Sequence, residues 1–431
     1  MKSRSISWPM LISVCVTALV IRLVWAAIIH SVPTSDFGYY FGKATGLVQG
    51  LGYTSNGKPT AFWPPGYPFF LAAVFRVFGA SLFVAKIAGI ALWTATTALA
   101  YLLGLRLGGR LTAALSGFIV ALFPEFIFFA NLTASENLFI PMSLGALLAL
   151  SSTEEFDAPP SWKRAALAGL LLGCAILARS TAVLLPVVIA LILVARFRSK
   201  PALVAAAALI VACAIPVAPW MARNAVLMGQ PVLSTNGGIS LWTGNNPLAT
   251  GKIGLKGPYP HQDLSSPSKE LATNSNFTRL ALTFIVQHPI EFIALVPGKF
   301  SGLFQEQPHS LAWNTEYDNR GTGGVAGRRS LDHREVQAVH LARWLRADQP
   351  IWMQGLWALG VLGTIVAVAR RRTAGVWIAA LIGYWLVFHL TLGNGQPRYL
   401  VSAAPTVAIG AAFAAAIGIE WIRHRRERPV G

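Results

Sequence analysis

Long apolar runs separated by short polar breaks dominate the sequence. Ten of them have about the length of a membrane-spanning helix, which needs roughly 20 mostly apolar residues. These runs cover residues 8–30, 82–107, 112–130, 137–152, 164–179, 180–196, 202–222, 351–370, 374–392 and 399–422. Lipid offers no hydrogen-bond partners, so each run must satisfy its own backbone, as an α-helix does. The pattern therefore predicts an all-α polytopic membrane protein with about ten transmembrane helices.

Three further segments are too short or too polar to cross a membrane comfortably, and we expect them to lie along its surface. Residues 37–50 and 66–78 each carry a narrow polar stripe on an apolar helix, which is typical of interfacial helices. In residues 277–305 the apolar run is interrupted by Gln287, Pro289 and other polar or helix-breaking residues. A transmembrane helix at 277–305 is the alternative, and it would invert the sidedness of everything that follows.

The formal net charge of +18 would suit a nucleic-acid-binding protein, but the distribution of the charges does not. Basic residues gather before the first run, in short breaks between later runs and at the C-terminus: Lys2, Arg4, Arg106, Arg110, Lys163, Arg164, Arg196, Arg198, Lys200, Arg370, Arg371, Arg372, Arg423, Arg425, Arg426 and Arg428. Short cytoplasmic loops of membrane proteins collect Lys and Arg in this way. The charge thus predicts membrane topology and argues against a nucleic-acid partner.

With the N-terminus inside, the chain divides into three regions. Residues 1–222 form an N-terminal membrane domain, whose first outer loop is 31–81. Residues 223–350 form an outer loop region, and residues 351–431 supply the last membrane helices and a basic cytoplasmic tail. The alanine-rich, arginine-biased composition suits a bacterial inner membrane, which would place the outer loops in the periplasm.

Two carboxylates stand at the predicted outer face. Asp36 follows the first run, and a carboxylate there can act as a general base if its proton partner lies within hydrogen-bond reach. Its alternative role is to cap the following helix. Glu136 is the last residue of an outer connection at 131–136, and ionisable groups at the edge of a span are costly enough to suggest a function. A capping or loop role remains the alternative for Glu136 as well.

Four cations oppose the positive-inside pattern, because they lie at the predicted outer face. They are Arg179, Arg223, Lys299 and Arg398. A planar guanidinium suits bidentate binding of a phosphate, and an ammonium can serve as a point charge. The alternative is that these side chains extend to the interface without a further role.

Residues 234–247, including Asn245 and Asn246, are rich in Asn, Gly and Trp. Sugar-binding loops share this composition with ordinary tight turns. The sequence has no Walker loop, dinucleotide fingerprint, HExxH motif or Cys/His cluster. The predicted cytoplasmic breaks are too short to bind a nucleotide, so a group donor would have to reach the protein through the membrane.

These features occur in an order that resembles the polytopic C-type glycosyltransferases, which use polyprenyl-phosphate sugars. The resemblance is strongest to the bacterial branch related to protein O-mannosyltransferases and lipid A aminoarabinose transferases. The motifs that carry it are Asp36, Pro64-Pro65-Gly66-Tyr67-Pro68, Ser135-Glu136, Pro219-Trp220 with Arg223-Asn224, Asn236-Gly237-Gly238, Gly244-Asn245-Asn246-Pro247 and Pro397-Arg398-Tyr399.

The resemblance implies an inverting sugar transfer from a polyprenyl phosphate to an acceptor hydroxyl at the outer membrane face. Asp36 would be the general base, and Glu136 would support the acceptor or a divalent metal ion. Arg398, Arg223 and Lys299 would hold the donor phosphate. Residues implied in substrate binding are Tyr40, Tyr67, Asn224, Asn245, Asn246 and Tyr399.

Several points stay open at this stage. Phe37 follows Asp36 where the mannosyltransferases have a second carboxylate, which puts a protein acceptor in doubt against a lipid or a glycan. A metal requirement is undecided, and the sequence names neither the sugar nor the acceptor. The alternative function is a transporter or flippase of lipid-linked sugars. Such proteins usually place ionisable groups near the bilayer midplane, often in repeated halves, whereas here the polar candidates gather at one face and no repeat is visible.

Overall fold

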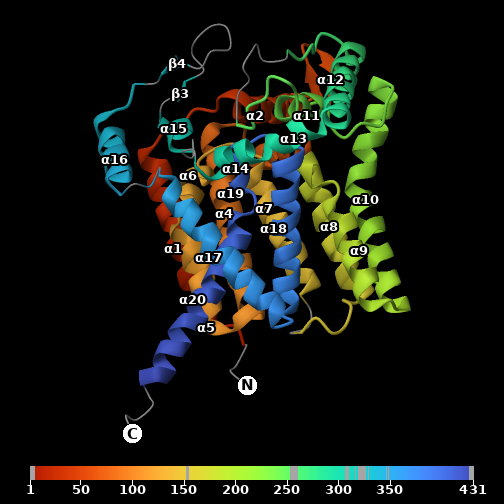
Figure 1. Cartoon of the computed structure of the whole chain (residues 1–431). Helices are drawn as coiled ribbons and strands as arrows, with labels where there is room; N and C mark the ends of the chain where they lie inside the picture. Colours follow the sequence, from red (N-terminus) through yellow and green to blue (C-terminus); the bar gives the residue numbers. More distant parts are fainter. Residues whose placement is uncertain are drawn as a thin grey trace.

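The computed structural model shows a bundle of long helices with short helices and loops gathered at one end (Figure 1). It describes residues 5–151, 155–252, 261–305, 310–315, 317–318, 327–328, 330–345, 347 and 349–426. Two antiparallel pairs of two-residue strands are the strand elements of this part of the chain: β1 (Thr54–Ser55) with β2 (Lys58–Pro59), and β3 (Tyr317–Asp318) with β4 (Gly327–Arg328). The predicted all-α class is confirmed.

Seven helical segments in the described residues are long and apolar enough to cross a membrane, or nine spans if two bent pairs are counted. The seven are α1 (Trp8–Ile28), α4 (Leu82–Gly108), Ser180–Phe197 with α9 (Leu185–Phe197), α10 (Lys200–Met228), α17 (Pro350–Ala369), α18 (Thr373–Thr391) and α20 (Ala404–Arg426). The sequence analysis predicted about ten, because it counted residues 137–152 and 164–179. The corresponding α7 (Glu136–Leu150) and α8 (Trp162–Ala178) have 15 and 17 residues. They are thus about 22 and 26 Å long, shorter than a typical hydrocarbon core.

The predicted span 112–130 is bent by 58° between α5 (Arg110–Leu122) and α6 (Pro124–Ala130). Pro124 cannot continue the helix, so the last carbonyls of α5 need other partners. Buried Arg22 of α1 supplies them, donating to the carbonyls of Val120 at 2.8 Å and Ala121 at 3.1 Å. A buried arginine in a membrane helix therefore caps the end of another helix.

We call the end of the bundle that carries the short elements the loop face. Its helices are α2 (Ser35–Val48), α3 (Gly66–Phe78), α11 (Gly237–Gly244), α12 (Pro267–Gln287), α13 (Pro289–Ala294), α14 (Val296–Phe304), α15 (Ser310–Thr315), α16 (His333–Trp344) and α19 (Arg398–Val401). The turns that join α4 to α5, α9 to α10 and α17 to α18 lie at the opposite end (Figure 1). These turns carry basic breaks that the sequence analysis placed in the cytoplasm.

The predicted surface segment 277–305 falls on the bent pair of α12 with α13 and α14, which turns by 100°. After this turn, α13 and α14 run across the loop end of the bundle rather than along it (Figure 1). Pro289 and Pro297 begin the two short helices, since a proline is tolerated in the first turn of a helix. This course places Lys299 beside the end of α18 and the start of α19.

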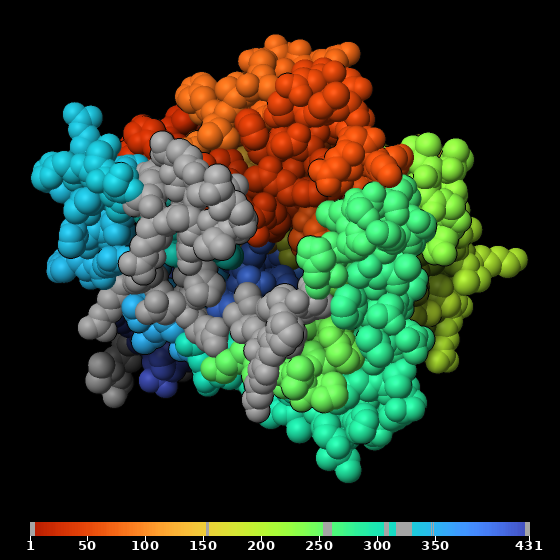
Figure 2. Space-filling model, turned by 90° about the horizontal axis from the view of Figure 1, so that it is seen from above, coloured from red at the N-terminus to blue at the C-terminus, as the bar shows by residue number. Residues whose placement is uncertain are grey.

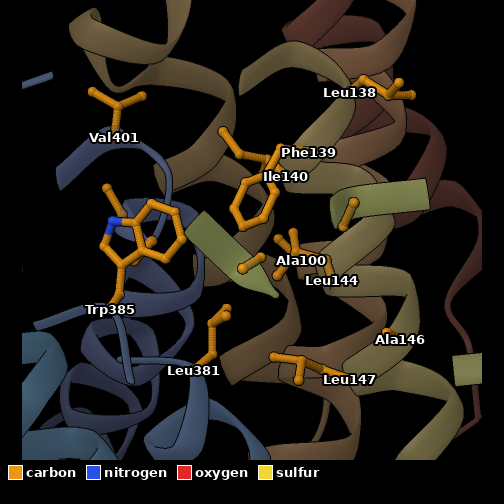
Figure 3. Packing of buried hydrophobic residues seen from close by; sticks show 14 of the residues in the cluster. Ala100, Leu138, Phe139, Ile140, Leu144, Ala146, Leu147, Leu381, Trp385 and Val401 are labelled. Atoms are coloured by element: carbon orange, nitrogen blue, oxygen red, sulfur yellow. The ribbon is translucent and has the colours of Figure 1, made fainter. Parts of the chain in front are cut away.

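The core beneath this end forms where α4, α7 and α18 meet (Figure 3). The ring of Trp385 lies 5.1 Å from that of Phe139, and Leu144 and Leu381 fill the layer below. The indole Nε1 of Trp385 donates to the carbonyl of Tyr399 at 2.7 Å. This packing fixes the backbone that presents Arg398.

Candidate active site

An ion pair joins α2, near the start of the chain, to α19, which precedes the last long helix. The guanidinium of Arg398 donates through Nη1 to Oδ2 of Asp36 at 2.6 Å, across 362 residues of sequence. The same guanidinium binds Glu136 in bidentate fashion, from Nε to Oε1 at 2.6 Å and from Nη2 to Oε2 at 2.9 Å. The sequence predicted that these three residues share a site, and the structure brings them into direct contact.

The local backbone explains why Asp36 points to this position. Thr34 occupies the N-cap of α2, and Asp36 lies inside the first turn, where the helix dipole favours a negative charge. Ser35 has a left-handed backbone with φ of 51°, which is uncommon for a residue other than glycine. Asp36 therefore does not fill the capping role that the sequence left open.

Arg179 completes the cluster. Its Nη1 lies 2.8 Å from Oε1 of Glu136 and 3.2 Å from Oγ of Ser135. Glu136 is completely buried beneath two guanidinium groups, whereas the side chain of Asp36 keeps 13% of its exposure. Of the two carboxylates, only Asp36 can be approached without moving an arginine.

Aromatic rings enclose Arg398. Its Cζ lies 4.6 Å from the ring centre of Phe37 and 5.5 Å from that of Trp313 in α15. Burial by itself would lower the pKa of Arg398, but Asp36 and Glu136 outweigh that effect and hold the pKa well above its usual range. The guanidinium therefore stays charged at any physiological pH.

Tyr40 of α2 and Tyr67 of α3 pack against each other. Both are buried, and their rings meet edge to face with centres 5.8 Å apart. Burial raises the pKa of Tyr40, and the charge of Asp36 acts in the same direction. Tyr40 consequently remains a hydrogen-bond donor at neutral pH and does not compete with Asp36 as a base.

A second polar group lies around Lys299. Its Nζ donates to Oδ1 of Asn245 at 2.8 Å and to the carbonyl of Thr391. The ring of Tyr399 stacks on that of His389 at 4.3 Å, and the Arg179 guanidinium lies 6.0 Å from the Tyr399 ring. Lys299, Asn245 and Tyr399, all predicted to bind substrate, thus occupy one neighbourhood next to the Glu136 cluster. Burial lowers the pKa of Lys299 to about 7.

The remaining predicted residues make other contacts among the described residues. Arg223 donates to the carbonyls of Tyr53 at 2.7 Å and Thr60 at 2.9 Å, and to Oδ1 of Asn224. It therefore clamps the β1–β2 arm to α10 and makes no contact with the Asp36 cluster. Asn246 closes its own turn by donating to the carbonyl of Trp242. Roles in substrate binding for Arg223, Asn224 and Asn246 stay predictions.

One group with the composition of a metal site occurs among the described residues. His30, Asp332 and Glu335 offer ligand atoms within 4.8 Å of one another where α16 meets the end of α1. Asp332 and Glu335 already satisfy each other's backbone N–H groups as a capping box. This group is separate from Asp36 and Glu136, whose oxygens are held by guanidinium groups.

The loop face is hollowed at its centre. Seen from this side, atoms of the blue C-terminal part lie at the bottom of a recess that the red and orange N-terminal segments border (Figure 2). Both kinds of segment contribute to the cluster, Asp36 from one and Arg398 from the other. A ligand would thus approach the cluster from the loop face.

Known proteins resemble this chain at two levels. Residues 63–220 match the family model for dolichyl-phosphate-mannose-protein mannosyltransferase, which is less than half of the chain. This range contains Tyr67, Glu136 and Arg179. No curated protein sequence is significantly similar to the chain.

Two proteins of known structure share the fold. ArnT from Cupriavidus metallidurans, bound to undecaprenyl phosphate, matches with a TM-score of 0.56 and 14% identity over 97% of this chain and 63% of its own. The Archaeoglobus fulgidus oligosaccharyltransferase AglB matches in its apo form with a TM-score of 0.55 and 13% identity, over 97% of this chain and 51% of its own. Its complex with zinc and sulfate gives a TM-score of 0.53 and 14% identity, over 96% and 50%.

The present chain therefore spans about half the length of AglB and less than two thirds of ArnT. The match to the mannosyltransferase model agrees with the resemblance drawn from the motifs, and the architecture agrees with both. Residues 63–220 thus resemble the mannosyltransferase family, and the fold of the chain is that of the polytopic glycosyltransferases ArnT and AglB.

Proposed function

We propose that the protein is an inverting glycosyltransferase, which moves a sugar from a polyprenyl phosphate to an acceptor hydroxyl. The active site is the recess of the loop face, which opens to the periplasm of a bacterial inner membrane. The observation that carries this proposal is the contact of Asp36 with Arg398 and, through Arg398, with Glu136. One approachable carboxylate then stands beside several buried cations.

Asp36 acts as the general base. The acceptor oxygen attacks the anomeric carbon of the donor sugar as the bond from that carbon to the phosphate oxygen breaks, and the acceptor proton passes to Asp36. The polyprenyl phosphate leaves as a stable anion, so no general acid is needed. Inversion follows because a single displacement attacks the face opposite the leaving group.

Glu136 and Arg179 position the reacting groups. Glu136 binds both arginines and is buried, so it orients the Arg398 guanidinium that in turn holds Asp36. A carboxylate fixed by a bidentate guanidinium keeps its geometry better than one held by a flexible ammonium. Glu136 therefore acts through the arginines and does not touch the substrate.

The donor phosphate binds on the cation side of the cluster. Lys299 lies beside the end of α18 and Arg398 begins α19, and Asn245, Tyr399, Tyr40 and Tyr67 supply polar and aromatic contacts. Fixed positive charges stabilise the charge that develops on the leaving phosphate. The bound undecaprenyl phosphate of ArnT supports a lipid-linked donor.

A divalent metal ion fits poorly at this cluster. Both oxygens of Glu136 and Oδ2 of Asp36 are bound to Arg398 or Arg179 at 2.6–2.9 Å, and a second cation would have to displace a guanidinium from them. One AglB structure contains zinc, so metal binding is a relevant question for proteins of this fold. No step of the proposed reaction passes through a metal.

The rival function is a flippase of lipid-linked sugars. A flippase needs two compartments, whereas an enzyme works in detergent. We expect the purified protein in detergent micelles to convert a member of a panel of radiolabelled undecaprenyl-phosphate sugars to undecaprenyl phosphate when acceptor lipid extract is added. Failure across the panel, together with transbilayer movement of the same lipids in proteoliposomes, would favour the flippase.

A further inference from the structure

His389 is a buried side chain that the proposed reaction has not used. It lies in the last turn of α18 with 2% of its surface exposed, and both ring nitrogens lack a hydrogen-bond partner among the described residues. Its neighbours are the rings of Tyr399, Trp385 and Phe388, with ring centres between 4.3 and 5.2 Å away. Buried polar groups in native proteins are nearly always paired, so an unpaired imidazole suggests a missing ligand.

Two cations flank this imidazole. Arg179 lies 6.0 Å from the ring of Tyr399, on which His389 stacks, and Lys299 donates to the carbonyl of Thr391, two residues beyond His389. Any anion held between Arg179 and Lys299 would therefore lie close to the His389 ring.

The charges of this neighbourhood do not balance. Three buried cations (Arg179, Arg398 and protonated Lys299) face the two carboxylates Asp36 and Glu136. Lys299 contacts no carboxylate among the described residues. An excess of one positive charge is complementary to a phosphodiester, which carries one negative charge, and a polyprenyl-phosphate sugar is such a diester.

The position of Lys299 is fixed by close packing of backbones. A Cβ at Gly302 would lie 2.4 Å from the carbonyl oxygen of Gly395, and one at Gly395 would lie 2.5 Å from that of Lys299. The backbone of Gly393 packs closely against the imidazole as well, since a Cβ there would lie only 2.7 Å from Nδ1 of His389. Glycines thus bring α14 onto the α18–α19 connection and bring that connection onto the imidazole.

We propose that His389 is a phosphate-binding residue, which donates a hydrogen bond from one ring nitrogen to a phosphate oxygen held between Arg179 and Lys299. The ligand class is a lipid-linked phosphate, either the donor diester or the product monoester. This inference rests on the proposed function for the identity of the ligand, but the anion site itself is assigned from the unpaired imidazole and the excess charge.

The test measures binding of undecaprenyl phosphate to the purified full-length protein in detergent, with inorganic phosphate and phosphatidylglycerol as competing sources of phosphate. Three variants are compared with the wild type. His389→Phe keeps the stacking on Tyr399 and removes the donor, His389→Asn restores a donor, and His333→Phe changes an exposed histidine of α16 as the matched control. Thermal unfolding of each variant without ligand is recorded in parallel.

We expect His389→Phe to weaken binding of undecaprenyl phosphate about tenfold or more, because a hydrogen bond to a charged group is lost. His389→Asn should recover part of the affinity, and His333→Phe should bind as the wild type does. Without ligand, His389→Phe should unfold at the same temperature as the wild type or higher, since it removes an unpaired polar group. A purely structural histidine would give a lower unfolding temperature instead.

Wild-type affinity in His389→Phe would overturn the assignment of His389. If His389→Phe does not fold, unchanged affinity in His389→Ala would overturn it in the same way. Failure of the proposed function gives a different result: the wild type would bind inorganic phosphate in a His389-dependent manner but not undecaprenyl phosphate. The anion site would then stand without a lipid-linked donor.

Discussion

Lys299 and Arg398 are both buried cations, but their surroundings differ. Arg398 binds two carboxylates, whereas Lys299 donates to an amide and a carbonyl oxygen and lies beside the ring of Phe292. Lys299 therefore keeps its proton only up to a pH of about 7 when no anion is bound, because burial lowers its pKa to that value. A bound phosphate favours the charged ammonium, so binding and proton uptake are linked.

We expect phosphate binding to weaken as the pH rises above 7. Above its lowered pKa, Lys299 must take up a proton for each phosphate bound, so affinity should fall by up to about tenfold per pH unit. Titrations with undecaprenyl phosphate between pH 7.5 and 9 measure this slope. Lys299→Arg, whose guanidinium stays charged, should give a flatter dependence of affinity on pH. The ratio of the wild-type affinity to the Lys299→Arg affinity at each pH cancels the effect of ligand ionisation, which is the same for both proteins. Equal slopes would contradict the link.

At the residue scale, the sequence predicted Asp36, Glu136 and Arg398 because each is an isolated charge beside an apolar run. The sequence analysis gave Arg223 the same phosphate-binding role as Arg398. Charge and predicted sidedness cannot show that the Arg223 guanidinium binds the carbonyls of the β1–β2 arm. The sequence analysis did not consider His389, although an ionisable residue inside a predicted span suggests a functional role. Trp313 had no signal, because its role depends on a contact across the fold with Arg398.

At the scale of elements, α14 depends on a glycine contact with the α18–α19 connection. We expect Gly302→Ala to move α14 away from Gly395 and to weaken binding of undecaprenyl phosphate about tenfold or more, because Lys299 moves with the helix. Gly355→Ala in α17 is the matched control, since a Cβ there meets no atom within 4 Å. Equal affinity in the two variants would show that the contact does not place Lys299.

Glu270 joins three segments of the loop face. Its carboxylate accepts hydrogen bonds from the hydroxyl groups of Thr60 and Thr235 and from the backbone N–H of Ala61. Glu270→Ala leaves these buried donors without an acceptor, which should destabilise the fold by roughly 2–5 kcal/mol. The unfolding midpoint of the purified protein should fall, and fall less in Glu270→Gln, which keeps one acceptor oxygen. An unchanged midpoint in Glu270→Ala would mean that water replaces the carboxylate.

The membrane helices were predictable because a long apolar run can satisfy its backbone only as a helix. Their boundaries agree with the sequence within a few residues for α1, α4 and α17. The bend between α5 and α6 was not predicted, although Pro124 marks its position. The carbonyls at the end of α5 are bound by Arg22 of α1, and a contact between two helices cannot be seen in the sequence of one of them. In residues 223–350 the sequence predicted an outer loop region with an interfacial segment at 277–305, and it did not separate the individual helices because they lack a regular apolar period.

At the scale of the whole molecule, the basic turns lie at one end of the bundle and the loop face lies at the other. We therefore expect the basic turns in the cytoplasm and the loop face outside it. We expect a cysteine at Ser275, exposed on α12, to react with a membrane-impermeant maleimide in intact cells, and one at Lys163 to react only after lysis. Cys15, Cys174 and Cys213 lie within helices of the bundle and are replaced by alanine in this background. Labelling of Lys163→Cys alone in intact cells would reverse the orientation and place the recess in the cytoplasm.

The site exists only in the complete fold, because its charged residues come from α2, α7, the end of α8 and α19. The central claim is that Asp36, held by Arg398, is the base of the transfer reaction. The most direct measurement is the initial rate of sugar transfer from the accepted undecaprenyl-phosphate sugar by the wild type, Asp36→Asn and the exposed-carboxylate control Asp263→Asn. The account predicts that Asp36→Asn is slower by about 10²–10⁴-fold with unchanged donor binding and unfolding temperature, while Asp263→Asn matches the wild type. A wild-type rate in Asp36→Asn would contradict it.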